Sequence, residues 1–292
     1  MKNWVSGIPY EIAFWKGVYF SKKRRERLFQ WSRYNDEIQL ANFDVKQFLS
    51  QQENPNIVDV GCGMSFCNGN KLNGELLNVC YLDPLASFFN KIINEKKLDL
   101  PKITLGFIEY LSAFVPNKAS LIIVQNTLDH SNNPLKGILE CIESLEIGAV
   151  LYLRHKPNEA EAENYRGFHQ YNISLENNEM FIWNKEMKIN VNSTLMGLAD
   201  IETSFYDGEI VAVIIKKQDL PKELLNSKND FSDLCYRYIG VIEDFNQASY
   251  SLRYHWNFFT FRIVQLIMQF FSHKTRTKIK TVIKFLTPIT KR

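Results

Sequence analysis

The chain has 292 residues, of which 45% are hydrophobic, and a formal net charge of +3. This apolar content can bury a sizeable core and excludes a disordered chain. The five cysteines include no C-x-x-C pair, which excludes a disulfide-dense module and favours reduced thiols in a cytoplasmic protein. Glu11 interrupts the first apolar residues, and no small-residue cleavage site follows, so no secretory signal is predicted.

The most informative stretch is residues 57–65, in which an apolar strand runs into a glycine turn. Asp59 belongs to this run, and Gly61 and Gly63 break it. Glycine at both positions indicates a tight turn that leaves room for a ligand close to the backbone.

An acidic residue follows at a spacing that gives this turn a function. A short helix over residues 70–77 and a second strand over 77–82 are predicted, and Asp83 ends that strand, 20 residues beyond Gly63. Open α/β sheets use strand, glycine turn, helix and strand to hold a nucleoside, whose ribose hydroxyls the later acid binds.

Apolar patterning predicts the remaining elements of the sheet. A continuous apolar run indicates a strand buried on both faces at 120–124. Helical spacing of apolar residues predicts a helix at 134–146, opened by Asn133 and Pro134 and stopped by Gly148. Further strands are expected at 103–106, 149–153, 201–205 and 209–215, the last two joined as an antiparallel hairpin by Asp207-Gly208.

These segments together resemble the class I S-adenosylmethionine (SAM)-dependent methyltransferases, whose first motif is D/E-x-G-x-G-x-G. The resemblance covers about residues 40–217, and Ser65 stands at the third glycine. It implies a doubly wound, seven-stranded, mostly parallel α/β sheet, with SAM as cofactor and S-adenosylhomocysteine as product. The cofactor-binding residues that it implies are Asp59, Gly61, Cys62, Gly63, Asp83, Pro84, Ile108, Glu109, Asn126 and His130.

The chain is long for one domain of this type. Residues 1–40 are predicted to form a helical cap, and residues 41–217 to form the methyltransferase domain. Residues 155–200 would be an acceptor-side insertion in that domain, and residues 218–292 a helical, basic and amphipathic extension.

The insertion carries the signal for the acceptor. Its pattern N-E-A-E…Y-x-G-x-H-Q-x-N, from Asn158 to Asn172, resembles methyltransferases of bacterial cell-surface polysaccharide clusters, as does Glu11-x-x-x-Trp15 near the N-terminus. This resemblance implies a saccharide or sugar-linked acceptor. A β-hairpin at 179–183 and 187–191 is also expected, either as a wall of the acceptor pocket or as an extension that covers the sheet.

Methyl transfer to a hydroxyl needs alignment and a base, for which imidazole is suited near neutral pH. The segments that carry His130, His155 and His169 are expected to converge above the sheet. His169 or His155 is the predicted base, with Glu159 orienting it or binding the acceptor, and His130 as a contact of the methionine end of SAM. Each histidine could equally be structural. His155, Glu159 and His169 fit no compact ligand motif, so no metal is predicted.

The C-terminal region differs from the rest in charge. Residues 262–292 hold eight Lys or Arg residues and no acid, which leaves −5 for the remainder of the chain. Residues 258–271 are almost all apolar, but Gln265 and Gln269 divide this run, and it is too short to span a bilayer. This composition predicts either peripheral contact of 258–292 with an anionic membrane, at the inner face of the cytoplasmic membrane, or packing on the same domain or on a second copy in a homo-oligomer. Nucleic acid is not an expected partner.

The predicted function is therefore O-methylation of a cell-surface glycan, a nucleotide sugar or a lipid-linked saccharide. Two alternatives stay open. One is a methyltransferase for another small acceptor, such as a phosphoramidate or an amine. The other is a SAM-binding scaffold without catalysis in a glycan-assembly complex.

Overall fold

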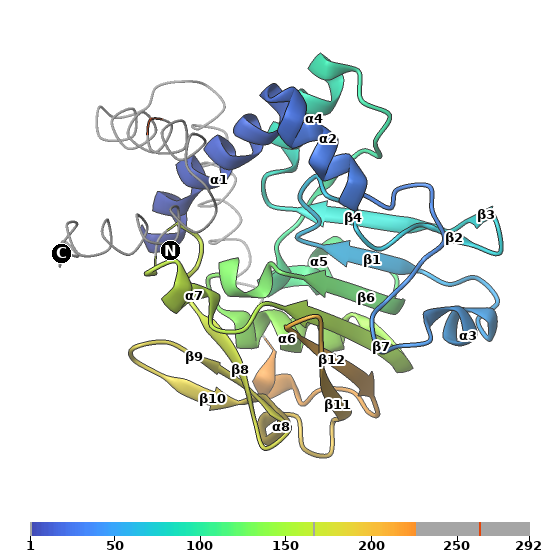
Figure 1. The fold of residues 1–292 in the computed structure, drawn as a ribbon. Coiled ribbons are helices and arrows are strands. Elements are labelled where there is room, and N and C mark those ends of the chain that lie inside the picture. The colour runs from blue at the N-terminus through green and yellow to red at the C-terminus, as the bar shows by residue number, and fades with distance from the viewer. Residues whose placement is uncertain (1, 166, 226–262, 264–292) are drawn as a thin grey trace.

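A seven-stranded sheet forms the centre of the computed structural model, which describes residues 2–165, 167–225 and 263 (Figure 1). Its strand order is β11-β12-β7-β6-β1-β4-β5. The pairs among β5, β4, β1, β6 and β7 are parallel, whereas β12 is antiparallel to both of its neighbours. The predicted seven-stranded, mostly parallel α/β sheet with an antiparallel last pair is confirmed. The strands are β1 (Ile57–Val60), β4 (Val79–Asp83), β5 (Thr104–Leu105), β6 (Ala119–Gln125), β7 (Leu145–His155), β11 (Ala199–Tyr206) and β12 (Glu209–Lys216).

Both faces of this sheet are buried, as its continuous apolar runs predict. Alternate residues of β6 point to opposite sides, so that Ile122 and Val124 belong to one core cluster and Leu121 and Ile123 to another. The first cluster packs on α5 (Leu111–Phe114) and α6 (Pro134–Glu143), and the second packs on α3 (Val45–Ser50).

The long N-terminal helix α1 lies along the edge of the sheet toward which β1, β4 and β6 point (Figure 1). Its apolar residues share a core cluster with the glycine turn and with α4. Helices therefore cover the carboxyl edge as well as the faces. The remaining helices are α1 (Lys2–Phe20), α2 (Lys22–Trp31), α4 (Ala86–Lys96), α7 (Glu159–Ala162), α8 (Val191–Thr194), η1 (Ile108–Tyr110), η2 (Leu128–His130) and η3 (Lys222–Leu224).

The inserted region forms a second sheet of three strands in the order β10-β9-β8. The predicted hairpin is present as β9 (Glu179–Trp183) and β10 (Lys188–Asn190), but the sequence analysis missed its partner β8 (Asn172–Glu176). Met180 and Ile182 of β9 are fully buried in the cluster that includes α6. The small sheet therefore covers the main sheet, as expected if the hairpin is an extension of this sheet; its role as a wall of the acceptor pocket stays a prediction.

The predicted helix over residues 70–77 is wrong. This segment is a short hairpin of β2 (Lys71–Leu72) and β3 (Glu75–Leu76). Asn73 and Gly74 join the strands with φ angles of +53° and +84°. Positive φ at both turn residues is the signature of an Asn-Gly hairpin turn, which was present in the sequence and outweighed helix formation.

Gly148 does not end the helix that precedes it. The N-terminus of α6 is as predicted, since the side chain of Asn133 accepts from the amide of Lys136 at 3.1 Å and Pro134 is the first helical residue. The helix already ends at Glu143, and β7 starts at Leu145. Gly148 lies inside β7 with φ +83°, where the pairing with β6 shifts register.

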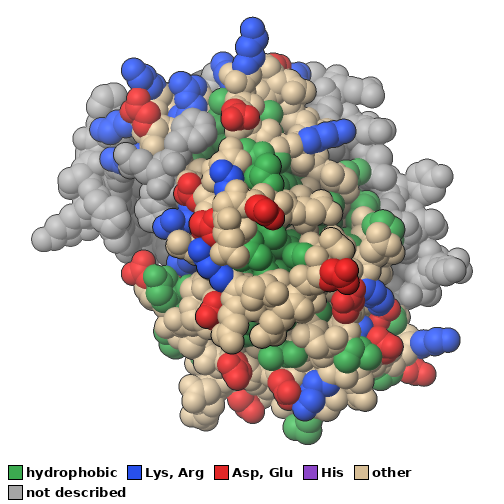
Figure 2. Space-filling model, turned by 90° about the vertical axis from the view of Figure 1, so that its right-hand side faces the viewer, with side chains coloured by type: hydrophobic (Ala, Val, Ile, Leu, Met, Phe, Trp, Pro, Cys, Tyr) green, Lys and Arg blue, Asp and Glu red, His purple; other side chains and the backbone are tan. Residues whose placement is uncertain are grey.

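The predicted C-terminal extension lies almost entirely outside the described residues, and so does its basic segment 258–292. Within the described part of the chain, no helix has both the length and the apolar character needed to cross a bilayer. On the face of the molecule shown in Figure 2, Lys and Arg side chains are interspersed with Asp and Glu.

Candidate functional site

The backbone turns tightly after β1, where Gly61 and Gly63 have φ angles of +68° and +53°. These angles lie in the left-handed region that favours glycine. The amide of Gly61 donates to the carbonyl oxygen of Leu82 in β4 at 2.7 Å, which holds the turn at the carboxyl ends of two adjacent strands. A Cβ at Gly61 would collide with the side chain of Thr127, so this position accommodates glycine alone.

Asp83, at the end of β4, lies directly against this turn. Its Oδ2 accepts from the amide of Gly63 at 3.1 Å, and its Oδ1 accepts from the amide of Leu85 at 2.8 Å. The structure therefore places Asp83 beside the glycine turn, as its position 20 residues beyond Gly63 predicts. Each carboxylate oxygen keeps a further lone pair for a ligand hydroxyl.

Acidic side chains gather in this part of the site. Asp59 and Asp83 are 5% and 7% exposed, and burial raises the pKa of each carboxyl to about 7. The charged groups that act on Asp83 are the acids Glu11 and Asp59, which raise its pKa further. Buried carboxyls with acidic neighbours favour a ligand that brings positive charge.

Helix α1 carries two residues onto the glycine turn. A Cβ at Gly63 would lie only 2.8 Å from Cζ2 of Trp15, so the indole ring rests against the turn. Nε1 of Trp15 donates to Oε1 of Glu11 at 2.7 Å, and the hydroxyl of Tyr19 donates to the carbonyl oxygen of Met64 at 2.9 Å. A ligand that enters between the turn and α1 therefore has to displace or contact Trp15.

Three other predicted cofactor residues surround this turn. Cys62 is buried, and burial raises the pKa of its thiol well above the usual value. Pro84 is half-buried immediately after the strand-end carboxylate. Asn126 has φ +49°, and its amide donates to the carbonyl oxygen of Arg154 while its Oδ1 accepts from the amide of Lys156 at 3.3 Å. Asn126 thus ties the end of β6 to the end of β7.

Ile108 and Glu109, two further residues of the predicted cofactor site, both have structural partners. Ile108 packs on α6, since a Cβ at Gly137 would lie 3.1 Å from it. Oε1 of Glu109 accepts from the amides of Asn132 and Asn133 at 2.6 and 3.3 Å, at the entry to α6. These side chains position the start of α6, and their contact with the cofactor stays a prediction.

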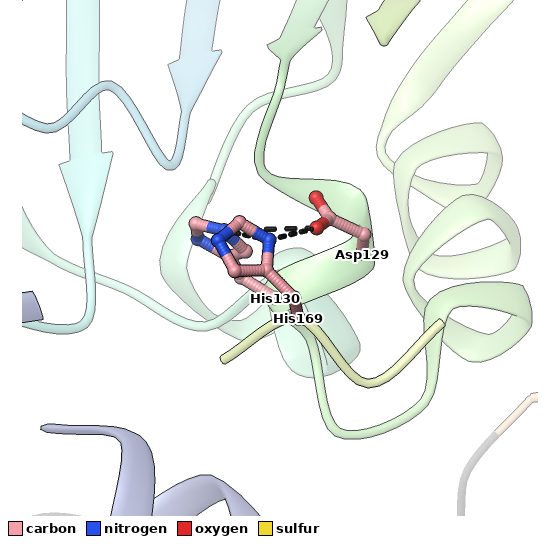
Figure 3. A group of neighbouring side chains, drawn as sticks. All are labelled: Asp129, His130 and His169. Atoms are coloured by element: carbon pink, nitrogen blue, oxygen red, sulfur yellow. Dashed lines mark hydrogen bonds and ion pairs between the residues drawn. The ribbon is translucent and has the colours of Figure 1, made fainter. Parts of the chain in front are cut away.

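A second group of polar side chains lies at the same edge, after β6 (Figure 3). Nδ1 of His169 is 2.7 Å from Oδ2 of Asp129 and 3.1 Å from Nε2 of His130. Burial lowers the pKa of His169, but the hydrogen bond and charge of Asp129 outweigh burial and raise it. The pKa of Asp129 is lowered because the neighbouring histidines outweigh its burial.

His155 and Glu159 lie beside this group. His155 is 2% exposed, and neither of its ring nitrogens has a hydrogen-bond partner among the described residues. Burial lowers its pKa to about 4, which keeps the ring neutral at pH 7. Oε1 of Glu159 lies 3.6 Å from Nζ of Lys156, and its charge acts on His169. The predicted convergence of the three histidine segments above the sheet is therefore present.

The sequence analysis missed two residues of this region. Asp129 directly precedes His130, and the available signal was its place in the segment that follows a buried strand. Trp15 was noted for its spacing from Glu11 but not placed at the glycine turn. The four-residue spacing on one helix face was the available signal.

No family model and no curated protein matches the chain. Among solved structures, it is similar to a S-adenosylmethionine-dependent methyltransferase from Clostridium acetobutylicum, with 11% identity, 61% of this chain and 94% of that chain covered, and a TM-score of 0.36. It is also similar to SAM-bound CalS10, an amino pentose methyltransferase from Micromonospora echinaspora, with 9% identity, 59% and 87% covered, and a TM-score of 0.37. The sugar N-methyltransferase KedS8 from Streptoalloteichus has 7% identity, 59% and 84% covered, and a TM-score of 0.35. Similarity at this level supports no argument about activity. The function therefore has to be argued from the side chains of the site.

Proposed function

We propose that this protein is a SAM-dependent methyltransferase that transfers a methyl group to a hydroxyl of a saccharide. The observation that carries the proposal is the contact of Asp83 with the amide of Gly63, in a buried site where the neighbouring charges are acidic. SAM fits such a site, because it offers ribose hydroxyls as donors together with a sulfonium and an ammonium group as positive charges.

Two parts of SAM, the ribose and the cationic methionine end, have complementary groups. The ribose hydroxyls donate to the free lone pairs of Asp83, as the later acid does in nucleoside-binding α/β sheets. Asp59, buried at the end of β1, adds negative charge for the cationic methionine end. Binding a cation here relieves the cost of holding two carboxylates in a buried environment.

The proposed acceptor site is the group formed by Asp129 and His169. Methyl transfer is an in-line displacement, so the protein supplies alignment and removes a proton from the hydroxyl. The carboxylate of Asp129 lies 2.7 Å from Nδ1 of His169, which leaves Nε2 as the atom that accepts this proton. A carboxylate that orients an imidazole in this way also stabilises the resulting imidazolium.

The proposed acceptor is a cell-surface glycan, a nucleotide sugar or a lipid-linked saccharide. It is supported by the resemblance of the N-E-A-E…H-Q pattern around Glu159 and His169 to methyltransferases of cell-surface polysaccharide clusters. A phosphoramidate or amine acceptor, or a scaffold without catalysis, predicts a different outcome in one assay. Transfer of labelled methyl from SAM to a saccharide fraction supports the proposal. Transfer only to amine pools supports the second acceptor class, and SAM binding without any transfer supports the scaffold.

The location at the inner face of the cytoplasmic membrane is part of the same proposal, and it depends on residues 258–292. Sedimentation with anionic vesicles tests it. The full chain is expected to sediment, and a chain lacking 258–292 is expected to stay in the supernatant. If both forms stay in the supernatant, the basic segment packs on protein, on the same chain or on a second copy.

Isothermal titration of the full chain with SAM and with S-adenosylhomocysteine tests the cofactor assignment. Asp83→Asn keeps the side-chain shape but loses the charge, and it should weaken binding by about tenfold to 100-fold, as expected for loss of a charged hydrogen bond. Asp200→Asn is the matched control, because Asp200 is an exposed carboxylate paired with Lys217 on β11. Wild-type protein that binds neither ligand, or equal binding by Asp83→Asn, would refute the assignment.

A further inference from the structure

Three ligand-type atoms lie close together where η2 meets the segment that precedes β8 (Figure 3). Oδ2 of Asp129 is 2.7 Å from Nδ1 of His169 and 3.7 Å from Nε2 of His130, and the two nitrogens are 3.1 Å apart. An ion about 2.1 Å from each donor, at angles of about 90–109°, needs donors about 3.0–3.4 Å apart. The observed separations bracket this range, so that small side-chain shifts would accommodate an ion.

Hydrogen bonds satisfy this group only in part. Nδ1 of His169 has either one hydrogen or one lone pair, yet it faces both Asp129 and His130. The side chain of Asp129 is only 4% exposed, and its buried Oδ1 has no hydrogen-bond partner among the described residues. Buried carboxylates are normally paired or coordinate a metal.

We propose that Asp129, His130 and His169 bind a divalent transition-metal ion of the Zn²⁺ or Fe²⁺ type. Two imidazole nitrogens and one carboxylate oxygen suit these ions, whereas Mg²⁺ and Ca²⁺ prefer oxygen ligands. Glu159 and Glu163 are close enough for their charges to act on His169, and this negative charge favours a cation. The ligand set differs from the one that sequence spacing excluded, because Asp129 and His130 replace His155 and Glu159.

The chemical role of the ion rests on the proposed function. Three protein ligands leave open positions, at which the acceptor hydroxyl binds and has its pKa lowered. Its proton passes to solvent, and its oxygen then attacks the methyl carbon of SAM. The O–CH₃ bond forms as the S–CH₃ bond breaks, and the electron pair stays on sulfur in neutral S-adenosylhomocysteine. His169 then serves as a ligand, and the ion replaces the imidazole as the activating group.

Titration of the chelator-treated full chain with Zn²⁺, and with Co²⁺ as a spectroscopic probe, tests the site. One ion per chain is expected, with visible Co²⁺ bands of nitrogen and oxygen coordination. His169→Ala, His130→Ala and Asp129→Asn should each weaken Zn²⁺ binding by about 100-fold, the scale on which even outer-shell partners of a metal reduce affinity. Asp129→Asn preserves the side-chain shape, so its result holds even where an alanine variant fails to fold.

Asp200→Asn is the matched control for Asp129→Asn, because Asp200 is an exposed carboxylate paired with Lys217; it should bind Zn²⁺ as the wild type does. Absence of binding to the wild type, or unchanged binding by all three ligand variants, overturns the proposal. An intense thiolate band in the Co²⁺ spectrum also overturns it, because the ion then lies on cysteines. SAM titration in the presence of chelator separates the two proposals. If the wild type binds SAM but does not bind Zn²⁺, the metal proposal alone is refuted.

Discussion

The two halves of the proposed site, one for the cofactor and one for the acceptor, are built from different kinds of contact. In the cofactor half, formed by the glycine turn and Asp83, a side chain accepts from backbone amides at the ends of two adjacent strands. In the acceptor half, formed by Asp129, His130 and His169, side chains contact each other. The cofactor half is therefore fixed by backbone conformation, and the acceptor half by the packing of segments about 40 residues apart.

This difference teaches how each half responds to substitution. A backbone turn tolerates few residues, and its failure changes folding as well as binding. A group of side chains can lose one member while the strands beneath it stay in place. Substitutions in the two halves should therefore separate stability and SAM affinity from methyl transfer.

The largest expected effect is on methyl transfer in the acceptor half. His169→Ala should lower the rate of labelled methyl transfer to a saccharide fraction by about 10²–10⁴-fold, because the hydroxyl loses the group that activates it. The dissociation constant of SAM, measured by titration, should change less than about twofold, since the cofactor half is untouched. A comparable loss of SAM affinity would contradict the division into two halves.

Substitution in the glycine turn of the cofactor half should instead lower the stability of the fold. Gly61→Ala places a Cβ against Thr127 at φ +68°, and it should lower the free energy of unfolding by about 2–4 kcal/mol. Chemical denaturation measures this loss. Gly208→Ala is the control, because Gly208 has φ +76° with open space around its Cβ position. It should cost only about 1 kcal/mol of backbone strain. Equal losses would show that conformation alone, and not the contact with Thr127, restricts position 61.

The same distinction explains what the sequence could predict. The positions of the main strands along the chain follow from buried apolar runs, and the meeting of Asp83 with the turn follows from their spacing; the parallel arrangement was implied by the resemblance to the class I methyltransferases. These are local signals. The Asn73-Gly74 turn was also local, but it was overlooked in favour of a helix between strands.

The acceptor half could be predicted only in outline. Its histidines were identified as a group, but nothing near Asp129 in the sequence indicates that a residue 40 positions later completes its hydrogen bond. Trp15 is similar, since its contact with Gly63 depends on how α1 lies across the sheet edge. Such contacts are set by tertiary packing, which residue spacing does not encode.

The affinity for SAM should depend on pH through the cofactor half. Burial raises the pKa of Asp59 and of Asp83 to about 7, and the ionised carboxylates are the forms that favour a cationic ligand. Binding near pH 6 should therefore release protons, and the dissociation constant should fall by up to about tenfold per carboxyl between pH 6 and pH 8. Titration in buffers of different ionisation enthalpy measures the protons, and Asp59→Asn should reduce their number.

The stability of the ligand-free protein should show the opposite trend. In the unfolded chain these two carboxyls have a pKa near the usual value of 3.8, whereas burial in the folded protein raises the pKa of each to about 7. The folded state thus binds more protons between these values, so their contribution to the free energy of unfolding falls as pH rises from about 4 to about 7. Denaturation at several pH values measures it. Asp83→Asn should flatten this slope, and a slope of the other sign would show that both carboxyls are ionised without ligand.

The smallest effect concerns Trp15, which links α1 to the cofactor half. Trp15→Phe keeps an aromatic ring near Gly63 but removes the 2.7 Å hydrogen bond from Nε1 to Glu11. It should lower the free energy of unfolding by about 0.5–1.5 kcal/mol. A loss of the same size in the free energy of SAM binding would lower the affinity for SAM by about twofold to tenfold.

Trp183→Phe is the matched control for this substitution, because Nε1 of Trp183 donates to Oγ of Ser174 at 3.1 Å in the small sheet. Both variants lose one indole hydrogen bond, so denaturation should show similar losses of stability. Only Trp15→Phe should weaken SAM binding, since Trp15 lies against Gly63 of the glycine turn and Trp183 lies in the small sheet. If both variants bind SAM equally well, α1 covers the turn without contributing to the cofactor half.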